Sequence, residues 1–170
     1  MKLLTHEIAT PWGKIATVVD VTDVPTVVAA GFKPMSKLIK QLPDQFNDQK
    51  FKNDNKLAGV TGVVKDWLDG DLNAFDDLQV LQLGGEFRQS CWKALRKVKA
   101  GKIITYAQLA HKAGNINAVR AAGSACAKNL IAPFVPCHRV IKTGGTIGNY
   151  AFGVTLKEAL LTHEGFHNLR

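Results

Sequence analysis

The sequence has few of the cysteines that stabilise small secreted proteins through disulfide bonds. It contains three, Cys91, Cys126 and Cys137, among 170 residues, and an odd number cannot pair completely within one chain. The N-terminus also lacks the charged and then apolar pattern of a signal peptide. We therefore expect free thiols in a reducing compartment, with a cytoplasmic location near the nucleoid, or a nuclear one in a eukaryotic source.

Long apolar runs are missing as well. No uninterrupted stretch approaches the roughly 20 residues that cross a bilayer, so nothing predicts a membrane protein. Hydrophobic residues still make up 46% of the chain, which is enough for one large or two small domains with apolar cores.

Acidic residues are scarce in the second half of the chain. Residues 1–84 hold nine Lys, no Arg and eleven acidic residues, a net charge of −2, whereas residues 85–170 hold eight Lys, five Arg and three acidic residues, a net charge of +10. A charge excess of this kind can simply keep a protein soluble. The concentration of every arginine in one half favours a polyanion such as DNA or RNA as the partner.

The first half of the chain is predicted to be a structural scaffold. Strand-like runs at Ile15–Val19 and Thr26–Ala30 follow turns and predict a hairpin in a small sheet. The polar segment 43–56 predicts a loop, and helical spacing over Val60–Leu68 predicts an amphipathic helix that ends near Gly70. No reactive group of residues appears there.

The second half predicts a pair of short helices after a helix whose apolar face includes Cys91. Thr105 and Gln108 form a capping box for a helix that ends at Gly114, and the next helix begins near Asn117. This is a helix-turn-helix pattern, which also occurs in many proteins that do not bind DNA. The apolar face is expected to consist of Phe87, Cys91, Leu95 and Val98.

The last part of the chain predicts an extended stretch, a turn and a final helix. Leu130–Val135 is expected to be extended, and 143–146 to form a turn too short for a phosphate loop. The final helix is expected to start at a second capping box, Thr155 to Glu158, and to stop at Gly165. Its apolar stripe would consist of Leu156, Ala159 and Leu160.

Residues 117–128 form a helix almost without large side chains, in which Arg120 is the only long one near the start. Base reading in the major groove needs several Arg, Asn or Gln side chains, so sequence-specific recognition is not expected. The pattern suits close contact with sugar-phosphate and a cation inserted beside a displaced base. The small residues alone favour a tightly packed core helix instead, and Arg120 in the middle of the segment argues against that alternative.

Cys137 lies in the segment Pro136-Cys137-His138-Arg139. A thiol attacks carbon only as a thiolate, and His138 and Arg139 are suitable neighbours to lower its pKa. Neighbouring residues of an extended segment face opposite ways, so we expect His138 to act through a water or a local bend. A buried structural cysteine is the alternative.

His163-Glu164-Gly165-Phe166-His167 matches a zinc-binding pattern that requires a continuous helix. Gly165 interrupts it, and no third ligand is evident nearby, so no metal site is expected there.

The segment from Pro136 to Val140 resembles the active-site signature of the O6-alkylguanine-DNA alkyltransferases, also called methylated-DNA–protein-cysteine methyltransferases. The resemblance covers essentially all of residues 87–165, and is loose in the first half. It implies an α/β (α+β) fold: a small N-terminal sheet-plus-helix, ribonuclease-H-like domain over residues 1–84 that acts as a scaffold, then a mainly helical, winged helix-turn-helix-like domain over 85–170 that binds DNA and transfers alkyl groups.

The resemblance implies direct repair of O6-alkylguanine, with O4-alkylthymine as a further candidate, by one irreversible transfer to Cys137. Glu164 would orient His138, which would act through water, and Tyr106, together with Lys157, would protonate the departing guanine. No cofactor and no metal is implied. The partner would be double-stranded DNA, bound by a monomer through the minor groove with little sequence specificity.

The resemblance also implies residues for DNA binding and for the pocket. DNA would contact Tyr106, Arg120, Ala121, Gly123, Ser124, Ala127 and Lys128, with Arg120 filling the place of the flipped base. The pocket and its support would comprise Asn129, Arg139, Val140, Gly148, Tyr150, Ala151 and Phe152.

Three departures from the family pattern carry expectations. Ala151 replaces a serine of many members, which leaves only a backbone amide for the guanine oxygen. Phe152 is bulky, so large substituents such as benzyl should fit poorly. The first half lacks cysteines, so the structural zinc of some relatives should be absent.

Three rival functions remain. A non-enzymatic lesion-binding protein of the same architecture would lack the reactive cysteine. A Cys-His hydrolase would need a base in direct reach of the thiol. A transcription regulator would need more base-reading side chains than Arg120.

Overall fold

A computed structural model describes residues 1–167. The chain forms two compact units, one made of Met1–Leu83 with Leu130–Phe134, the other of Gly84–Asn129 and the chain from Val135. The domain boundary predicted at Gly84-Gly85 placed residues 130–134 in the second unit. This segment joins the first because Ala30 N–H donates to Leu130 O (2.7 Å) and Leu130 N–H donates to Gln82 Oε1 (2.9 Å).

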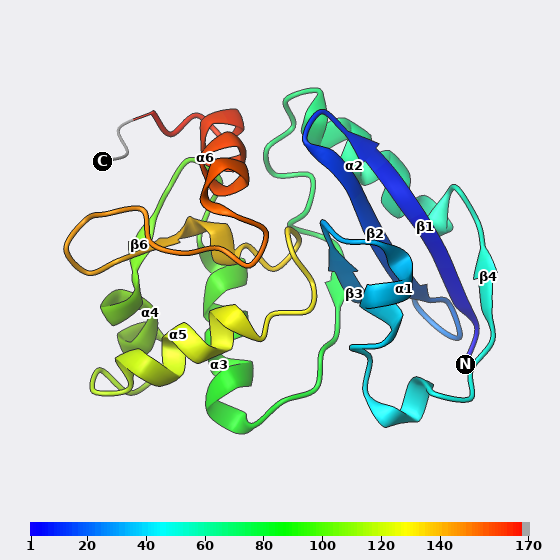
Figure 1. Ribbon diagram of the computed structural model, residues 1–170, viewed down its shortest axis with the longest axis horizontal. Helices are drawn as coiled ribbons and strands as arrows, with labels where there is room; N and C mark the ends of the chain where they lie inside the picture. The colour runs from blue at the N-terminus through cyan, green and yellow to red at the C-terminus, as the bar shows by residue number, and fades with distance from the viewer. Residues whose placement is uncertain (168–170) are drawn as a thin grey trace. The chain divides into compact units, whose positions relative to one another are not determined.

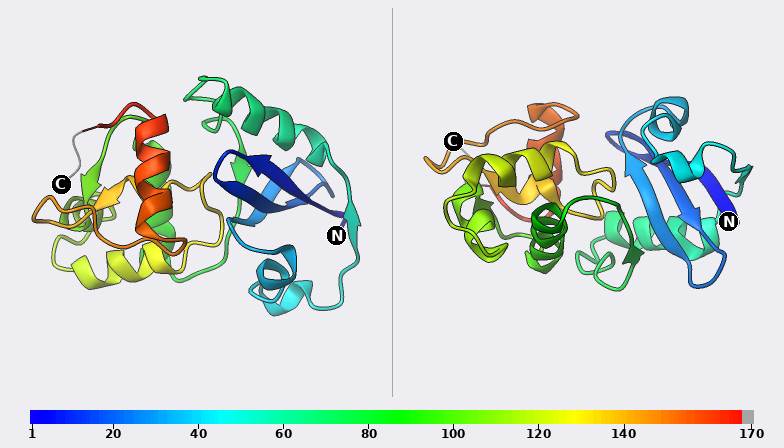
Figure 2. Two further views of the ribbon diagram at one scale, coloured as in Figure 1. Left: turned by 45° about the horizontal axis from the view of Figure 1, so that its top comes forward. Right: turned by 90° about the horizontal axis from the view of Figure 1, so that it is seen from below.

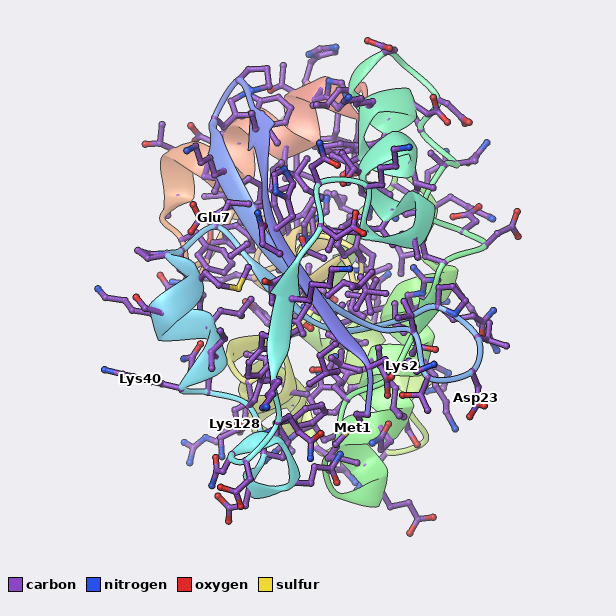
Figure 3. The ribbon with its side chains drawn as sticks, turned by 90° about the vertical axis from the view of Figure 1, so that its right-hand side faces the viewer. Met1, Lys2, Glu7, Asp23, Lys40 and Lys128 are labelled. Carbon is purple, nitrogen blue, oxygen red and sulfur yellow. The ribbon has the colours of Figure 1, made fainter. Side chains whose placement is uncertain are left out.

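The first unit is built on a five-stranded sheet with the order β4-β1-β2-β3-β5. Antiparallel pairs join β1 to β2 and β2 to β3, so the predicted hairpin is confirmed, while β4 and β5 pair in parallel with β1 and β3 (Figure 1; Figure 3 shows β4 along β1). Sequence patterning missed β1, because His6 and Glu7 interrupt its apolar alternation. The strands are β1 (Leu3–Thr10), β2 (Gly13–Asp20), β3 (Thr26–Gly31), β4 (Phe51–Asn53) and β5 (Gln79–Val80).

Two helices, α1 (Met35–Ile39) and α2 (Val60–Leu68), cover opposite faces of this sheet (Figure 2). The helix predicted at Val60–Leu68 is confirmed, and Trp67 on it is fully buried against the rings of Trp12 and Phe75. The loop predicted over 43–56 was wrong in part. It contains the 3₁₀ turn η1 (Asp44–Phe46) and strand β4, and a further 3₁₀ turn, η2 (Leu57–Gly59), follows it.

The second unit is mainly helical. Its helices α3 (Glu86–Lys97), α4 (Tyr106–Lys112) and α5 (Val119–Ala127) pack together (Figure 1). A parallel pair, β6 (Ile104–Thr105) and β7 (Val140–Ile141), lies beside them, and α6 (Val154–His163) follows. Cys91 is fully buried on α3, as predicted. No helix in the described part of the chain combines the length and apolar character needed to span a bilayer.

The predicted capping box of α4 is confirmed. Gln108 N–H donates to Thr105 Oγ1 (3.1 Å), and Thr105 N–H donates to Gln108 Oε1 (2.8 Å). The capping box predicted at Thr155 was wrong. The N-cap of α6 is Gly153, two residues earlier, and its positive φ of 98° turns the chain into the helix without a side-chain cap.

The buried face of α6 also differs from the predicted apolar stripe. Leu160 is buried, but Leu156 and Ala159 are only partly so. The face that packs inward consists of Lys157, Leu160, Leu161 and Glu164. Two ionisable side chains therefore occupy positions that hydrophobic patterning assigns to apolar residues.

Replacing Thr105 with Ala should lower the free energy of unfolding by about 1 kcal/mol, because the amide of Gln108 loses its cap. Urea unfolding measures this. The matched control is Thr155→Ala, at an exposed position in the first turn of α6, which should stay within about 0.5 kcal/mol of the wild type. Equal losses in the two variants would contradict the assignment of the caps.

Candidate active site

Cys137, His138 and Arg139 form a 3₁₀ turn, η3, and not the extended segment expected from the sequence. Arg139 N–H donates to Pro136 O (3.1 Å) and Cys137 N–H donates to Val135 O (2.9 Å), which closes the turn. The argument that His138 and Cys137 face opposite ways therefore does not hold. Of the two possibilities that the sequence allowed for His138, a bridging water and a local bend of the chain, the bend is present.

Glu164 is the centre of a buried polar cluster. Its Oε1 is hydrogen-bonded to His138 Nε2, and its Oε2 accepts from Arg139 Nε (2.8 Å), with Arg139 Nη2 at 2.5 Å. Arg139 Nη1 also donates to Val98 O (2.5 Å). The exposed fractions are 0% for His138, 5% for Arg139 and 2% for Glu164, so these interactions operate in a low-dielectric interior.

The charges in this cluster follow from burial and pairing. Burial raises the pKa of Glu164, but His138 and Arg139 outweigh it and lower the pKa below its ordinary value. Burial lowers the pKa of His138 despite the opposing effect of Glu164. Near neutral pH the cluster thus consists of a carboxylate, a guanidinium and a neutral imidazole.

A neutral imidazole that donates from Nε2 to Glu164 leaves Nδ1 as an acceptor. His138 Nδ1 and the Tyr150 hydroxyl are both buried and have no hydrogen-bond partner within residues 1–167. The two rings meet edge to face with centroids 6.4 Å apart. A buried polar atom of this kind is normally satisfied by a bound water.

Cys137 is 8% exposed, and its Sγ accepts a hydrogen bond from Asn129 Nδ2 (3.3 Å), which also donates to Val135 O (2.8 Å). Burial raises the pKa of the thiol, while the Asn129 amide and the charge of Lys157 oppose this rise. The prediction that His138 and Arg139 lower this pKa was wrong. Arg139 is already paired with Glu164, and His138 is neutral.

Lys157 ties α6 to the segment after the cysteine. Its Nζ donates to Val140 O (2.6 Å) and Asn149 O (3.1 Å), and the side chain is fully buried. Burial lowers the pKa of Lys157 to about 8, although Cys137 and Cys126 raise it. The lysine is thus a buried, hydrogen-bonded cation near the thiol.

A cavity of about 420 Å³ opens at Cys137. It is lined by Tyr106, Gly123, Cys126, Ala127, Cys137, Lys142, Asn149, Tyr150 and Ala151. Burial, followed by the charges of Cys126 and Cys137, raises the pKa of Tyr106 to about 12, so its hydroxyl stays protonated at neutral pH.

Of the residues expected in the pocket, Tyr150 and Ala151 line this cavity, and Asn129 donates to the thiol that opens onto it. Val140 and Gly148 are buried beside it, and Gly148 adopts a positive φ of 74°. Phe152 does not line the cavity, but packs edge to face on Tyr150 with centroids 5.4 Å apart.

Sequence reasoning missed Cys126, Lys142 and Asn149 as lining residues. Cys126 is only partly buried and lines the cavity. Its spacing of three residues from Gly123, which also lines the cavity, places the two on one side of the helix and was the available signal.

The two sides of α5 differ. Ala122 and Ala125 are buried, and Trp92 Nε1 donates to Ala125 O (2.9 Å). The opposite side is exposed and carries Arg120, Ala121, Ser124, Ala127 and Lys128. The core-helix alternative thus applies only to the buried side of α5. The exposed side forms a surface of small side chains next to the cavity.

No group of three or more His, Cys, Asp or Glu side chains able to hold a metal ion occurs within residues 1–167. In the zinc-like pattern, α6 ends at His163, Gly165 has a φ of 91°, and Glu164 is bound to His138 and Arg139. The pattern therefore does not present its side chains on one helical face.

Comparison with known proteins points to one family. The family described as 6-O-methylguanine DNA methyltransferase, DNA binding domain, matches residues 86–166. The chain is 34% identical over 169 residues to methylated-DNA–protein-cysteine methyltransferase of Shigella flexneri, with 98% of each chain covered. It is 50% identical over 78 residues to the human protein of that name, covering 46% of this chain and 38% of the human one.

Solved structures agree. The fold is similar to O6-methylguanine methyltransferase of Mycobacterium tuberculosis, with a TM-score of 0.72, 26% identity, and coverage of 96% of this chain and 92% of the other. A crystal structure of the M. tuberculosis protein OGT in complex with DNA is similar with a TM-score of 0.74 at 27% identity, with the same coverage. The α/β class expected from the sequence, a small sheet domain and a helical domain, is confirmed.

Replacing Glu164 with Gln should lower the free energy of unfolding by about 3 to 5 kcal/mol at neutral pH, because Arg139 loses its buried counter-charge. The folded-state pKa of Glu164 is depressed, so its contribution is present above the unfolded value of about 4.3 and is lost as pH falls through the folded value. Urea unfolding over a pH series should show the difference from wild type shrinking in acid.

Glu158→Gln provides the matched control, because Glu158 is exposed on the same helix. It should change stability by less than about 0.5 kcal/mol. A difference between wild type and Glu164→Gln that stays constant across the pH series would refute the charged state assigned to Glu164.

Proposed function

Because this chain belongs to the methylated-DNA–protein-cysteine methyltransferase family, we propose that it repairs DNA directly by moving the alkyl group of O6-alkylguanine to Cys137. The observation that carries this proposal is Cys137 at the cavity, where its Sγ is hydrogen-bonded to Asn129 and the buried Glu164–His138 pair lies in and next to its turn. The cysteine is consumed, so each molecule acts once.

The reaction is a displacement at the alkyl carbon. The Cys137 thiolate forms a bond from Sγ to that carbon, the bond from the carbon to guanine O6 breaks, and the electron pair stays with the base. The base takes up one proton and becomes guanine. The protein must therefore remove a proton from a thiol whose pKa burial has raised and deliver one to the leaving base.

For the first proton, we assign His138 as the acceptor through a bridging water. Its Nδ1 is buried without a hydrogen-bond partner within residues 1–167, and Glu164 fixes the tautomer in which this atom is the acceptor. The carboxylate also stabilises the imidazolium that forms. Lys157 and Asn129 favour the thiolate by charge and by hydrogen bonding.

For the second proton, Tyr106 is the donor, since it lines the cavity with a protonated hydroxyl. Lys157 is not a lining residue, and its Nζ donates to two carbonyls. We therefore assign Lys157 to support of the thiolate and of the pocket wall, in place of the proton-donating role implied by the resemblance.

The DNA partner fits the exposed side of α5. Small side chains at Ala121, Ser124 and Ala127 allow close approach to a groove, and Arg120 is the cation that can enter the stack when the guanine flips into the cavity. Contact with sugar and phosphate needs no base-specific side chains, which fits repair at any sequence.

A Cys-His hydrolase is disfavoured. Such an enzyme needs its base in direct contact with the thiol. Here the hydrogen bond described for Cys137 Sγ comes from Asn129, and the Nε2 of His138 is bound to Glu164.

Incubation with a duplex oligonucleotide containing O6-methylguanine tests the proposal. The intact protein should gain the mass of one methyl group per molecule, located on Cys137 by peptide mapping. Cys137→Ser should gain none, and Cys126→Ser, which changes the other cysteine of the cavity, should still gain one. If the mass of the wild-type protein does not change, the proposed function is refuted.

Large O6 substituents should react more slowly than methyl, because Tyr150 lines the cavity and Phe152 packs on its ring. Phe152→Ala should raise the benzyl-to-methyl rate ratio, since Tyr150 could then move aside. Single-turnover rates on paired substrates measure this ratio. Equal benzyl and methyl rates in the wild type would show that the pocket does not select by size.

A further inference from the structure

The second unit carries a groove that shares no lining residue with the cavity at Cys137. Its volume is about 620 Å³, and it lies among the C-terminal half of α3, the turn that follows and the C-terminal end of α4. Five lysines line it: Lys93, Lys97, Lys99, Lys102 and Lys112. All five are exposed. We call it the lysine groove.

No acidic side chain lines the lysine groove. It holds five of the eight lysines of residues 85–170 and none of the three acidic residues of that half. Within residues 1–167, Lys93, Lys97, Lys102 and Lys112 form no ion pair. Mutual repulsion of these ammonium groups is relieved when an anion binds among them.

Helix dipoles explain only part of the cluster. Lys97 and Lys112 lie in the last turns of α3 and α4, where a cation stabilises the unpaired carbonyls. The effect fades beyond the last turn. Lys93 lies a turn earlier, and Lys102 lies past the helix, so neither is needed for this purpose.

We propose that the lysine groove binds the sugar-phosphate backbone of double-stranded DNA, as a contact additional to the exposed side of α5. This inference rests on the proposed function, which brings the same unit to DNA. Lysines neutralise phosphates as point charges without reading bases. No aromatic side chain lines the groove, so it lacks the stacking surface that single strands use.

The test compares the wild type with K93Q/K97Q/K102Q in binding a duplex oligonucleotide that contains O6-methylguanine, over a series of salt concentrations. Each lost phosphate contact lowers the slope of log affinity against log salt by about 0.9. The triple variant should therefore lose about 2 to 3 in slope. If it does not fold, as judged by thermal unfolding, K102Q alone should lose about 0.9.

The matched control is K14Q/K40Q/K52Q, which removes the same charge from exposed positions of the first unit; the side chain of Lys40 extends away from the ribbon in Figure 3. This control should keep the wild-type slope. Equal losses in the two triple variants would assign the effect to net charge and overturn the inference. So would an unchanged slope in the groove variant, or a greater loss on the single strand than on the duplex.

Methyl transfer by the wild type on the same duplex separates the two proposals. A wild type that never gains a methyl group refutes the proposed function. A wild type that gains it, together with an unchanged slope in the groove variant, refutes only the lysine groove.

Discussion

The buried carboxylate of Glu164 is the interaction on which the site depends. It lies at the end of α6 and binds both His138 and Arg139 from the 3₁₀ turn η3, and Arg139 in turn reaches Val98 O at the end of α3. Three separate segments are thus joined by one charge. Because the carboxylate is almost fully buried, removing any partner leaves a charge or a polar atom without compensation in the interior.

The same burial opposes formation of the reactive thiolate. Enclosing Cys137 raises the pKa of the thiol, which keeps it protonated and unreactive at rest. Asn129 and Lys157 oppose this rise, and in the proposed reaction the Glu164–His138 pair takes up the proton of the thiol. A thiol that is shielded until a substrate fills the cavity suits a residue that can be used only once.

The second unit separates its surfaces by chemistry. The exposed side of α5 has mostly small side chains and carries one long cation near its start, Arg120, whereas the lysine groove carries exposed lysine charges and no arginine. In the two proposals, the first surface allows close approach to the groove of DNA, and the second neutralises phosphates. The net charge of residues 85–170 thus resolves into distinct sites.

Much of the fold follows from the sequence alone. The hairpin, α2, the burial of Cys91 and Leu95 on α3 and the capping box of α4 were predicted because local patterns specify them: alternation, helical spacing and a Thr-to-Gln pair three residues apart. Strand β1 and the start of α6 were missed, because pairing across the sheet and the positive φ of Gly153 outweighed the local signal.

For the site, the sequence by itself determined the identity of the acceptor, through the segment around Cys137 and its resemblance to a family. Only the tertiary structure decided how the neighbours act. It bent Cys137–Arg139 into a turn, paired Arg139 with Glu164, turned Cys126 to the cavity and bound Lys157 to two carbonyls. These outcomes depend on contacts between residues far apart in the chain, which determine where a buried charge finds its partner and which local patterns do not encode.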